Sequence, residues 1–431
     1  MTHTRIVGLA LATALVLPAA ATAQYPSSQP APKAAKAGKL SSRTLRVCKR
    51  GCAFRTIRSA VRAARAGNTI RVGNGVYHEG VKIVGRSKRR LRLIGNPKHP
   101  GRVVIEGGHH VDNGVLINGA DRVTLDGFTA RNYTANGFFA TNVVGYHFNH
   151  LDANHGGAYG LFAFNSKGGL MENSQASFNN DSGFYIGQTP RQKHPKRSLV
   201  RHVKAFANVL GWSGTNMRYV TITKSQWFNN GVGLVPNALD SEKFAPPEDN
   251  LIVDNDIFWN NFDYYRGAPF PIPSPSSTST ETAFPVGTGV LLFGGRRDKV
   301  VNNRIFGNFL VGVGAIKQIL LTSQPQNQNL VGNQVRGNSF GLNGTDLNGR
   351  DLFYDGSGTN NCFGPNTGVR VTVPASGSTL VPCPFTGANA FDQAAQSEAF
   401  GWVGDATHEA HWIRHPHAPR RGVTPLEHFT P

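Results

Sequence analysis

The chain has 431 residues, with 45 lysines and arginines against 25 acidic residues and a formal net charge of +20. Beyond the N-terminal region no stretch offers about 18 uninterrupted apolar residues, so we expect no membrane span. Zinc-finger spacings, RNA-recognition signatures and helix-turn-helix patterns are absent, which excludes a dedicated nucleic-acid-binding protein. The positive charge instead favours an anionic polysaccharide or cell-wall glycan as the partner.

The N-terminus has the order of a secretory signal peptide. A short basic region (1–5) precedes an apolar run (6–21), and small residues up to Ala23 predict cleavage after that position, so that 1–23 is the signal peptide. Residues 24–44 are rich in Pro, Ala, Ser and Lys, which is typical of a flexible linker. We therefore expect a secreted protein, located outside the cell or in the cell wall.

The four cysteines form two local pairs. In an exported protein this pattern predicts two disulfides, Cys48–Cys52 and Cys362–Cys383, one near each end of the fold. The alternative is a zinc site built from all four thiolates, which would require segments about 310 residues apart to meet.

Residues 45–111 are expected to form an N-terminal cap and the first coils of a repeat fold. Phe54, Ile57, Val61 and Ala64 recur at helical spacing, and Gly67 suits the end of a short helix. Strand patterns follow at 69–72, 81–83, 91–94 and 103–105.

From residue 112 to about 345 the sequence repeats itself. Glycines that each open a short apolar stretch recur 23 residues apart, at Gly114, Gly137, Gly160 and Gly183, and again at Gly289 and Gly312. Asparagines recur late in the repeat, near residues 179, 229, 260 and 308. A coil of this length holds three short strands, so the sequence predicts an all-β fold, a right-handed parallel β-helix of about ten coils with stacked asparagine ladders. Residues 346–431 are left as a C-terminal cap and tail.

The residues resemble a known group of β-helix proteins. The segment CAFRTIRSAVRAARAGNTIRVGNGVYHEGVKI is similar to the N-terminal cap and first coil of the pectate-lyase-like superfamily, as are the repeats at 114–340. The stretch GLVPNALDSEKFAPPEDNLIVDND resembles secreted actinobacterial β-helix proteins. The resemblance covers about residues 46–345 and implies the fold. It implies no single chemistry, because the superfamily includes lyases, hydrolases, epimerases, esterases and non-catalytic adhesins.

Insertions are the expected place for a site, because the interior of a regular coil is packed. The segments 188–198, 238–250 and 317–329 leave from the same point of the repeat, so we expect them to stack along one edge of the rod. The first two would form the wall of a groove over a strand face. A further insertion at 263–287 is low-complexity Pro/Ser/Thr.

The residues of these insertions suggest the chemistry of a polysaccharide lyase, which neutralises a sugar carboxylate and abstracts a proton. Lys193, His194 and Lys196 are the candidates for the base. Candidates for contact with the sugar are Arg191, Arg197, Trp212, Arg218 and Tyr264. If a metal is bound we expect Ca²⁺, with Asp240 and Glu242 as ligands. The hydrolase alternative pairs Asp181 with Asp152 as general acid and base.

Two functions of different class stay open. The first is an enzyme, a polysaccharide lyase or glycoside hydrolase, that acts on an anionic polysaccharide. The second is a non-catalytic surface or matrix protein that binds the same glycan through its basic face. In both cases we expect a monomer without further cofactors.

Overall fold

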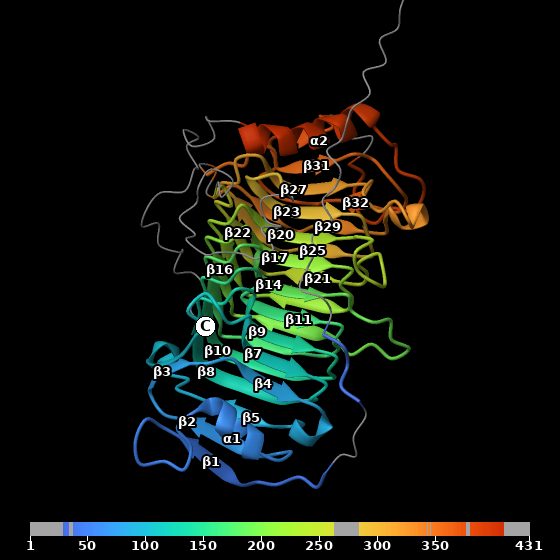
Figure 1. Cartoon of the computed structure of the whole chain (residues 1–431). Helices are drawn as coiled ribbons and strands as arrows, with labels where there is room; N and C mark the ends of the chain where they lie inside the picture. Colours follow the sequence, from blue (N-terminus) through green and yellow to red (C-terminus); the bar gives the residue numbers. More distant parts are fainter. Residues whose placement is uncertain are drawn as a thin grey trace, which may run out of the picture.

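The structure is a computed structural model that describes residues 29–33, 38–262, 284–342, 344, 346–375 and 380–408, without the side chains of 403–408. The predicted signal peptide, Tyr264 and most of the insertion at 263–287 lie outside the described residues. The chain forms a rod of stacked coils that runs from the N-terminal cap at one end to a helix at the other (Figure 1).

Two long sheets line the rod, and every strand pair within them is parallel. This organisation is the parallel β-helix that the repeats predict. The 11-stranded sheet, here sheet B, consists of β4 (Val81–Val84), β7 (Asn113–Asn118), β9 (Asn136–Thr141), β11 (Leu161–Phe164), β14 (Ser182–Gly187), β17 (Leu210–Thr215), β20 (Val232–Asn237), β23 (Thr288–Phe293), β27 (Val311–Ile316), β31 (Leu352–Tyr354) and β33 (Thr372–Val373).

The 20-stranded sheet, here sheet A, contributes the other two strands of most coils. Its members are β1 (Thr44–Val47), β2 (Thr69–Val72), β3 (Gly75–His78), β5 (Arg92–Ile94), β6 (Val103–Glu106), β8 (Val123–Arg131), β10 (Tyr146–Asn154), β12 (Leu170–Glu172), β13 (Gln175–Ser177), β15 (Ser198–Arg201), β16 (Lys204–Phe206), β18 (Val220–Thr223), β19 (Gln226–Phe228), β21 (Leu251–Val253), β22 (Asp256–Phe258), β25 (Lys299–Val301), β26 (Arg304–Phe306), β29 (Gln334–Arg336), β30 (Ser339–Phe340) and β32 (Cys362–Phe363). A small two-stranded sheet joins β24 (Gly295–Arg296) and β28 (Leu330–Val331).

The repeated glycines stack on one another in sheet B. Val115 pairs with Phe138, and Phe138 with Leu161, so the glycine that precedes each of them lies in register with the next. A Cβ on Gly137 would lie 2.8 Å from the carbonyl oxygen of Gly160, closer than real Cβ atoms approach. Glycine is therefore required here by the close approach of successive coils.

The core lies between the sheets and is filled by alternate strand residues. Phe138, Leu161, Phe184 and Leu234 are each 0% exposed and belong to one continuous cluster that follows the rod. Full burial of such side chains stabilises the fold by about 1.5–3 kcal/mol each.

Asparagine ladders run along the turns. In the longest, the side-chain amide of each asparagine donates to the side-chain oxygen of the next at 2.8–3.1 Å, in the order Asn179, Asn208, Asn230, Asn260, Asn308 and Asn348. The ladder expected from the sequence is present, although its third member is Asn230 and not Asn229. Each amide also donates to a backbone carbonyl, and each side-chain oxygen after the first accepts the backbone N–H of the preceding asparagine, so the ladder satisfies polar groups of the turn backbone.

Both ends of the rod are covered. Helix α1 (Ile57–Ala63) packs on the first coil, and its first two free N–H groups, of Ile57 and Arg58, donate to Glu79 at 2.7 and 2.9 Å. At the other end α2 (Gln393–His408) packs Trp402 against Phe353, with ring centroids 4.5 Å apart. Short 3₁₀ turns occupy Arg86–Lys88, Pro100–Arg102 and Pro325–Asn327. No helix in the described part of the chain is long and apolar enough to cross a membrane.

Both predicted disulfides are present, Cys48–Cys52 and Cys362–Cys383. Their pairing rules out the four-cysteine zinc site. The first joins β1 to the segment that leads into α1, and the second ties the C-terminal segment to β32, the last strand of sheet A.

Candidate functional site

An open cleft of about 490 Å³ lies on the outer face of sheet A. Its floor is a column of three residues in register on neighbouring strands: Leu251 on β21, Lys299 on β25 and Gln334 on β29. The other residues that line it are Arg197, Asp249, Asn250, Arg297, Gly332, Asn360, Phe385 and Thr386. The cleft therefore combines a strand face, the turns beside it and one C-terminal segment.

The C-terminal segment reaches the cleft because of the second disulfide. Gln334 pairs with Cys362 on the next strand, and Cys362 is bonded to Cys383, two residues before Phe385. The half-exposed ring of Phe385 is thereby held at the end of the column that Lys299 and Gln334 form.

The cleft is cationic. Arg197, Arg297 and Lys299 are exposed, and among the lining residues Asp249 is the one acid. Asp249 accepts two hydrogen bonds from Arg297, at 2.8 and 3.0 Å, and these raise the pKa of Arg297. Arg197 donates to the backbone oxygen of Asp249 at 3.1 Å. Two positive charges are left without a compensating carboxylate, so the cleft suits an anionic ligand.

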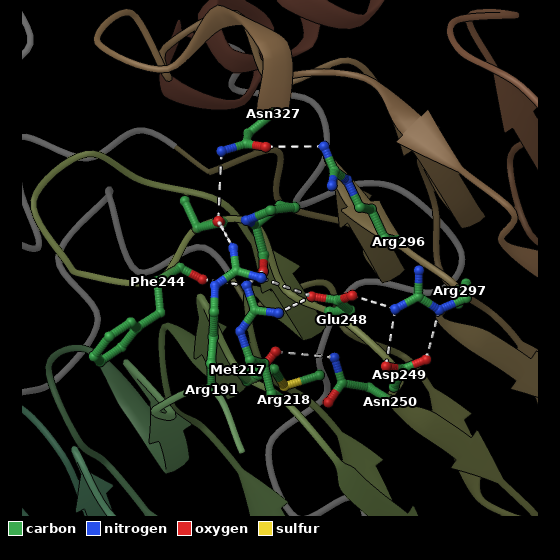
Figure 2. Close-up of polar contacts among 12 residues, drawn as sticks. Arg191, Met217, Arg218, Phe244, Glu248, Asp249, Asn250, Arg296, Arg297 and Asn327 are labelled. Atoms are coloured by element: carbon green, nitrogen blue, oxygen red, sulfur yellow. Dashed lines mark hydrogen bonds and ion pairs between the residues drawn. The ribbon is translucent and has the colours of Figure 1, made fainter. Parts of the chain in front are cut away.

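A network of three arginines around Glu248 lies next to the cleft and contacts Arg297, one of its lining residues. Figure 2 shows the Glu248 carboxylate between the guanidinium groups of Arg191, Arg218 and Arg297, with ion pairs to all three. Arg191 also donates to the Ala245 carbonyl at 3.2 Å. The insertions 188–198 and 238–250 thus lie against each other, and the same acid helps to position Arg297 in the cleft.

Arg218 is a structural member of the network. It is 1% exposed, donates to Glu248 and to the carbonyls of Phe244 and Pro246, and its pKa is lowered to about 10 by burial. The prediction that Arg218 contacts a substrate is therefore wrong, because the side chain has no access to the surface.

Trp212 is a second correction. Its side chain is 0% exposed and packs edge-on against Trp227 with ring centroids 6.1 Å apart. It stands at the inward position of β17, so the prediction that it stacks on a sugar in the groove is wrong. Trp212 follows Gly211 and is the register partner of Phe184 and Leu234, which occupy the same buried position in the neighbouring coils.

The predicted catalytic residues do not gather at the cleft. Lys193, His194 and Lys196 are exposed on the first insertion, but of that insertion only Arg197 is among the residues that line the cleft. Asp181 stands in the turn before β14, where burial raises its pKa to about 7 against hydrogen bonds from Tyr159 and Ser182. The negative charge of Asp181 acts on Glu242 and adds to the rise of its pKa, whereas Asp152 interacts with Asn154, Gln175 and His155.

The predicted calcium ligands have separate partners. Asp240 accepts hydrogen bonds from Ser323 of the third insertion, one of them from its backbone N–H at 2.8 Å. Glu242 is 5% exposed, accepts a hydrogen bond from Tyr185, and burial raises its pKa to about 8. A carboxyl group that is protonated near neutral pH is a poor ligand for Ca²⁺. Within the described ranges no three His, Cys, Asp or Glu side chains are arranged to hold a metal ion.

Arg297, Lys299 and Phe385 were not predicted as site residues. A signal existed for the first two, because the run Arg296-Arg297-Asp298-Lys299 precedes a strand one coil after the acidic insertion. The long insertion at 263–287 interrupts the repeat between the acidic insertion and this run. The pairing of Leu251 with Lys299 could therefore not be deduced from their spacing in the sequence.

Comparisons with known proteins find similarity at the level of the structure. No protein-family model matches the chain, and no curated protein matches it. The A-module of the mannuronan C-5 epimerase AlgE6 from Azotobacter vinelandii has 16% identity and a TM-score of 0.49, covering 73% of this chain and 89% of that one. The pectate lyase Pel9A has 14% identity and a TM-score of 0.40, with 81% and 82% covered. An alginate lyase from Paenibacillus sp. str. FPU-7 has 11% identity and a TM-score of 0.38, with 69% and 94% covered. The function is therefore argued from the residues of the chain itself.

Proposed function

We propose that this protein is an extracellular binder of anionic polysaccharides, and that a polyuronate chain lies in the cleft on sheet A. The observation that carries the proposal is the column of Leu251, Lys299 and Gln334 flanked by Arg197 and Arg297. Sugar carboxylates would pair with the exposed cations, and the half-exposed ring of Phe385 offers an apolar surface to a sugar face.

Binding is favoured over cleavage by the position of the candidate bases. Lys193, His194 and Lys196 are absent from the described lining of the cleft, and Asp181 and Glu242 hydrogen-bond to Tyr159 and Tyr185 outside it. The two disulfides support an extracellular setting, because such bonds persist in oxidising compartments.

The test measures the affinity of the whole chain for polygalacturonate and for alginate by calorimetry. Fully methyl-esterified polygalacturonate is the matched ligand without charge. The informative variant is Lys299→Gln, since Lys299 is exposed at the centre of the column. A hydrogen bond to a charged group contributes about 1.5–3 kcal/mol, so we expect at least about a tenfold loss of affinity.

Lys224→Gln, which removes an exposed lysine outside the cleft, is the control and should bind like the parent. Equal affinity for the charged and the esterified polymer, or an unchanged Lys299→Gln variant, would contradict the proposal. The ultraviolet absorbance of the same mixtures is followed in parallel. An increase caused by unsaturated uronate products would show that the protein cleaves the polymer by β-elimination, and would contradict a function limited to binding.

A further inference from the structure

The positive charge of the chain is concentrated at one end of the rod. Residues 38–102 contain eighteen lysines and arginines and a single acid, Glu79, a net charge of +17 out of the total of +20. Sixteen of the eighteen cations are exposed, all except Lys88 and Arg89. We call this surface the N-terminal basic end.

Glu79 does not offset this charge at the surface. It is 5% exposed, and its two carboxylate oxygens accept the N–H groups of Ile57 and Arg58 at the start of α1. The negative charge of Glu79 thus compensates the unpaired amides of the helix, leaving the outside of the end without an acid.

Several arginines elsewhere in the rod pair with a carboxylate. Arg131 pairs with Glu106, Arg201 with Glu172 and Arg304 with Asp256, each at 2.5–2.7 Å. By contrast, no ion pair recorded among the described residues involves a cation of 38–102. Repulsion among these cations destabilises the folded end of the rod. An anionic ligand bound at this surface would relieve that repulsion.

Few of these cations have a structural role of their own. Lys88 donates to the carbonyls of Val61, Arg62 and Ala64, where α1 ends, and so compensates the C-terminus of the helix. Lys49 lies 4.5 Å from the ring centroid of Tyr77. Neither contact uses an arginine side chain, so the exposed arginines remain available to a ligand.

The exposed arginines form two adjoining groups. Arg58 and Arg62 stand four residues apart on α1, which places them on neighbouring positions of the helix surface, and Arg65 follows just beyond the end of the helix. Arg46 and Arg71 are register partners on β1 and β2, about 4.8 Å apart, and Arg92 follows on β5. Because α1 packs against β1 and β2, the two groups belong to one end of the rod, as Figure 1 shows.

We propose that the N-terminal basic end is a second binding surface, distinct from the cleft, for a linear polymer of closely spaced oxyanions. Thirteen of the eighteen cations are arginines, whose planar guanidinium groups pair with two oxygens of a carboxylate or phosphate at once. Two sources share this chemistry, a polyuronate and a phosphodiester-linked wall polymer. A lipid surface fits less well, because the exposed apolar side chains of the end, Leu40, Val76 and Val84, are far outnumbered by its sixteen exposed cations, and its one phenylalanine, Phe54, packs against the core.

The test measures the binding of the whole chain to poly(glycerol phosphate) and to polygalacturonate at increasing salt concentration. The main variant is Arg58→Gln/Arg62→Gln/Arg65→Gln, which retains good helix formers at exposed positions. For flexible nucleic-acid strands each contact contributes about 0.7 to the slope of log affinity against log salt. We therefore expect the slope to fall by about 2 units in this variant, for the polymer that the end binds.

Two further variants keep the test decisive. Lys224→Gln/Lys243→Gln/Arg370→Gln removes the same charge from exposed positions outside the end and should leave the slope close to that of the parent. Arg46→Gln/Arg71→Gln on the strands should reproduce the loss if the helix variant fails to fold, which circular dichroism reveals. An equal loss in all variants would overturn the proposal in favour of unspecific charge.

The remaining measurements distinguish binding at the N-terminal basic end from binding in the cleft and from binding to a membrane. Lys299→Gln should leave the slope for poly(glycerol phosphate) unchanged, so failure of the cleft and failure of the basic end are distinguishable. Binding to vesicles of phosphatidylglycerol and phosphatidylcholine, without binding to either soluble polymer, would overturn the proposal and assign the end to a lipid surface. A parent chain that binds none of these probes would overturn it as well.

Discussion

Replacing Asp298 by asparagine should change how the stability of the rod depends on pH. Asp298 occupies a rung of a ladder whose other members are Asn250, Asn333, Asn361 and Asn389. Its Oδ1 accepts from the N–H and the side-chain amide of Asn250 at 3.0 and 2.8 Å. In the neighbouring ladder Asn303 donates its amide to Asn338 at 3.0 Å. Asp298 has an oxygen, Oδ2, in place of that donor, and among the described residues Oδ2 has no hydrogen-bond partner.

The ladder therefore favours the protonated form of Asp298. The side chain is 2% exposed, and burial raises its pKa from 3.8 to about 7, with Asp249 adding to the rise and the positive charge of Arg218 opposing it. Between about pH 4 and pH 7 the folded chain binds one more proton than the unfolded chain, so its free energy of unfolding falls as pH rises. A shift of about 3 units corresponds to about 4 kcal/mol, all of it lost above pH 7.

The assay is urea unfolding at pH values from 4 to 8. At pH 4 Asp298→Asn should resemble the parent, whereas at pH 8 it should be more stable by up to about 4 kcal/mol. Asn303→Asp is the reciprocal variant and should gain the pH dependence that Asp298→Asn loses. Parallel curves for the parent and Asp298→Asn across the range would refute the reasoning.

Three further substitutions test the site and the core. Glu248→Gln removes the charge between Arg191, Arg218 and Arg297 and leaves Arg218 buried without its carboxylate, so we expect a loss of about 3–5 kcal/mol in urea unfolding; a loss below about 1 kcal/mol would contradict the network. Trp212→Ala should lower stability by about 3–5 kcal/mol while the glycan affinity of the folded fraction, measured by calorimetry, stays unchanged, and a selective loss of affinity would restore its predicted role. Asn260→Ala leaves the backbone N–H of Asn230 without its acceptor, at a cost of about 1–3 kcal/mol for that group alone, and hydrogen exchange of that amide should accelerate.

The fold was predictable because the geometry of each coil requires particular residue types at fixed positions, and these residues recur in the sequence. Gly137 and Gly160, which are 23 residues apart, have no room for a Cβ, so the period of the repeat appears in the sequence itself. Asn260 and Asn308 satisfy a turn in successive coils, although an insertion lengthens their spacing to 48 residues. The disulfides followed from the spacing of the cysteines for the same reason, since each pair closes a local loop.

The site was less predictable because it depends on register across insertions. Arg197 and Lys299 are about a hundred residues apart but line one cleft, and the insertion 263–287, which interrupts the repeat, lies between them in the sequence. The side on which a residue lies was also ambiguous near turns, where many residues have positive φ. Arg218, which lies between Asn216 and Tyr219, both with positive φ, was expected outside and is buried.

The two proposed surfaces lie on the same face of the rod, which allows one polymer to occupy both. Arg92 and Lys299 belong to a single register column of sheet A, seven strand steps apart through Thr124, His147, Leu170, Leu199, Thr221 and Leu251. At about 4.8 Å per step the separation is about 34 Å. A polyuronate long enough to span this distance would bind the second surface as an intramolecular event.

Affinity should therefore rise steeply with polymer length, by at least about tenfold once the chain exceeds about 34 Å, while shorter oligosaccharides should bind the cleft alone. Calorimetry with size-fractionated oligogalacturonates measures this dependence. Arg71→Gln/Arg92→Gln should abolish the rise without weakening the shortest ligands, because neither residue lines the cleft. A smooth increase in proportion to the number of sugar units, unchanged in that variant, would show that the cleft and the basic end bind independently.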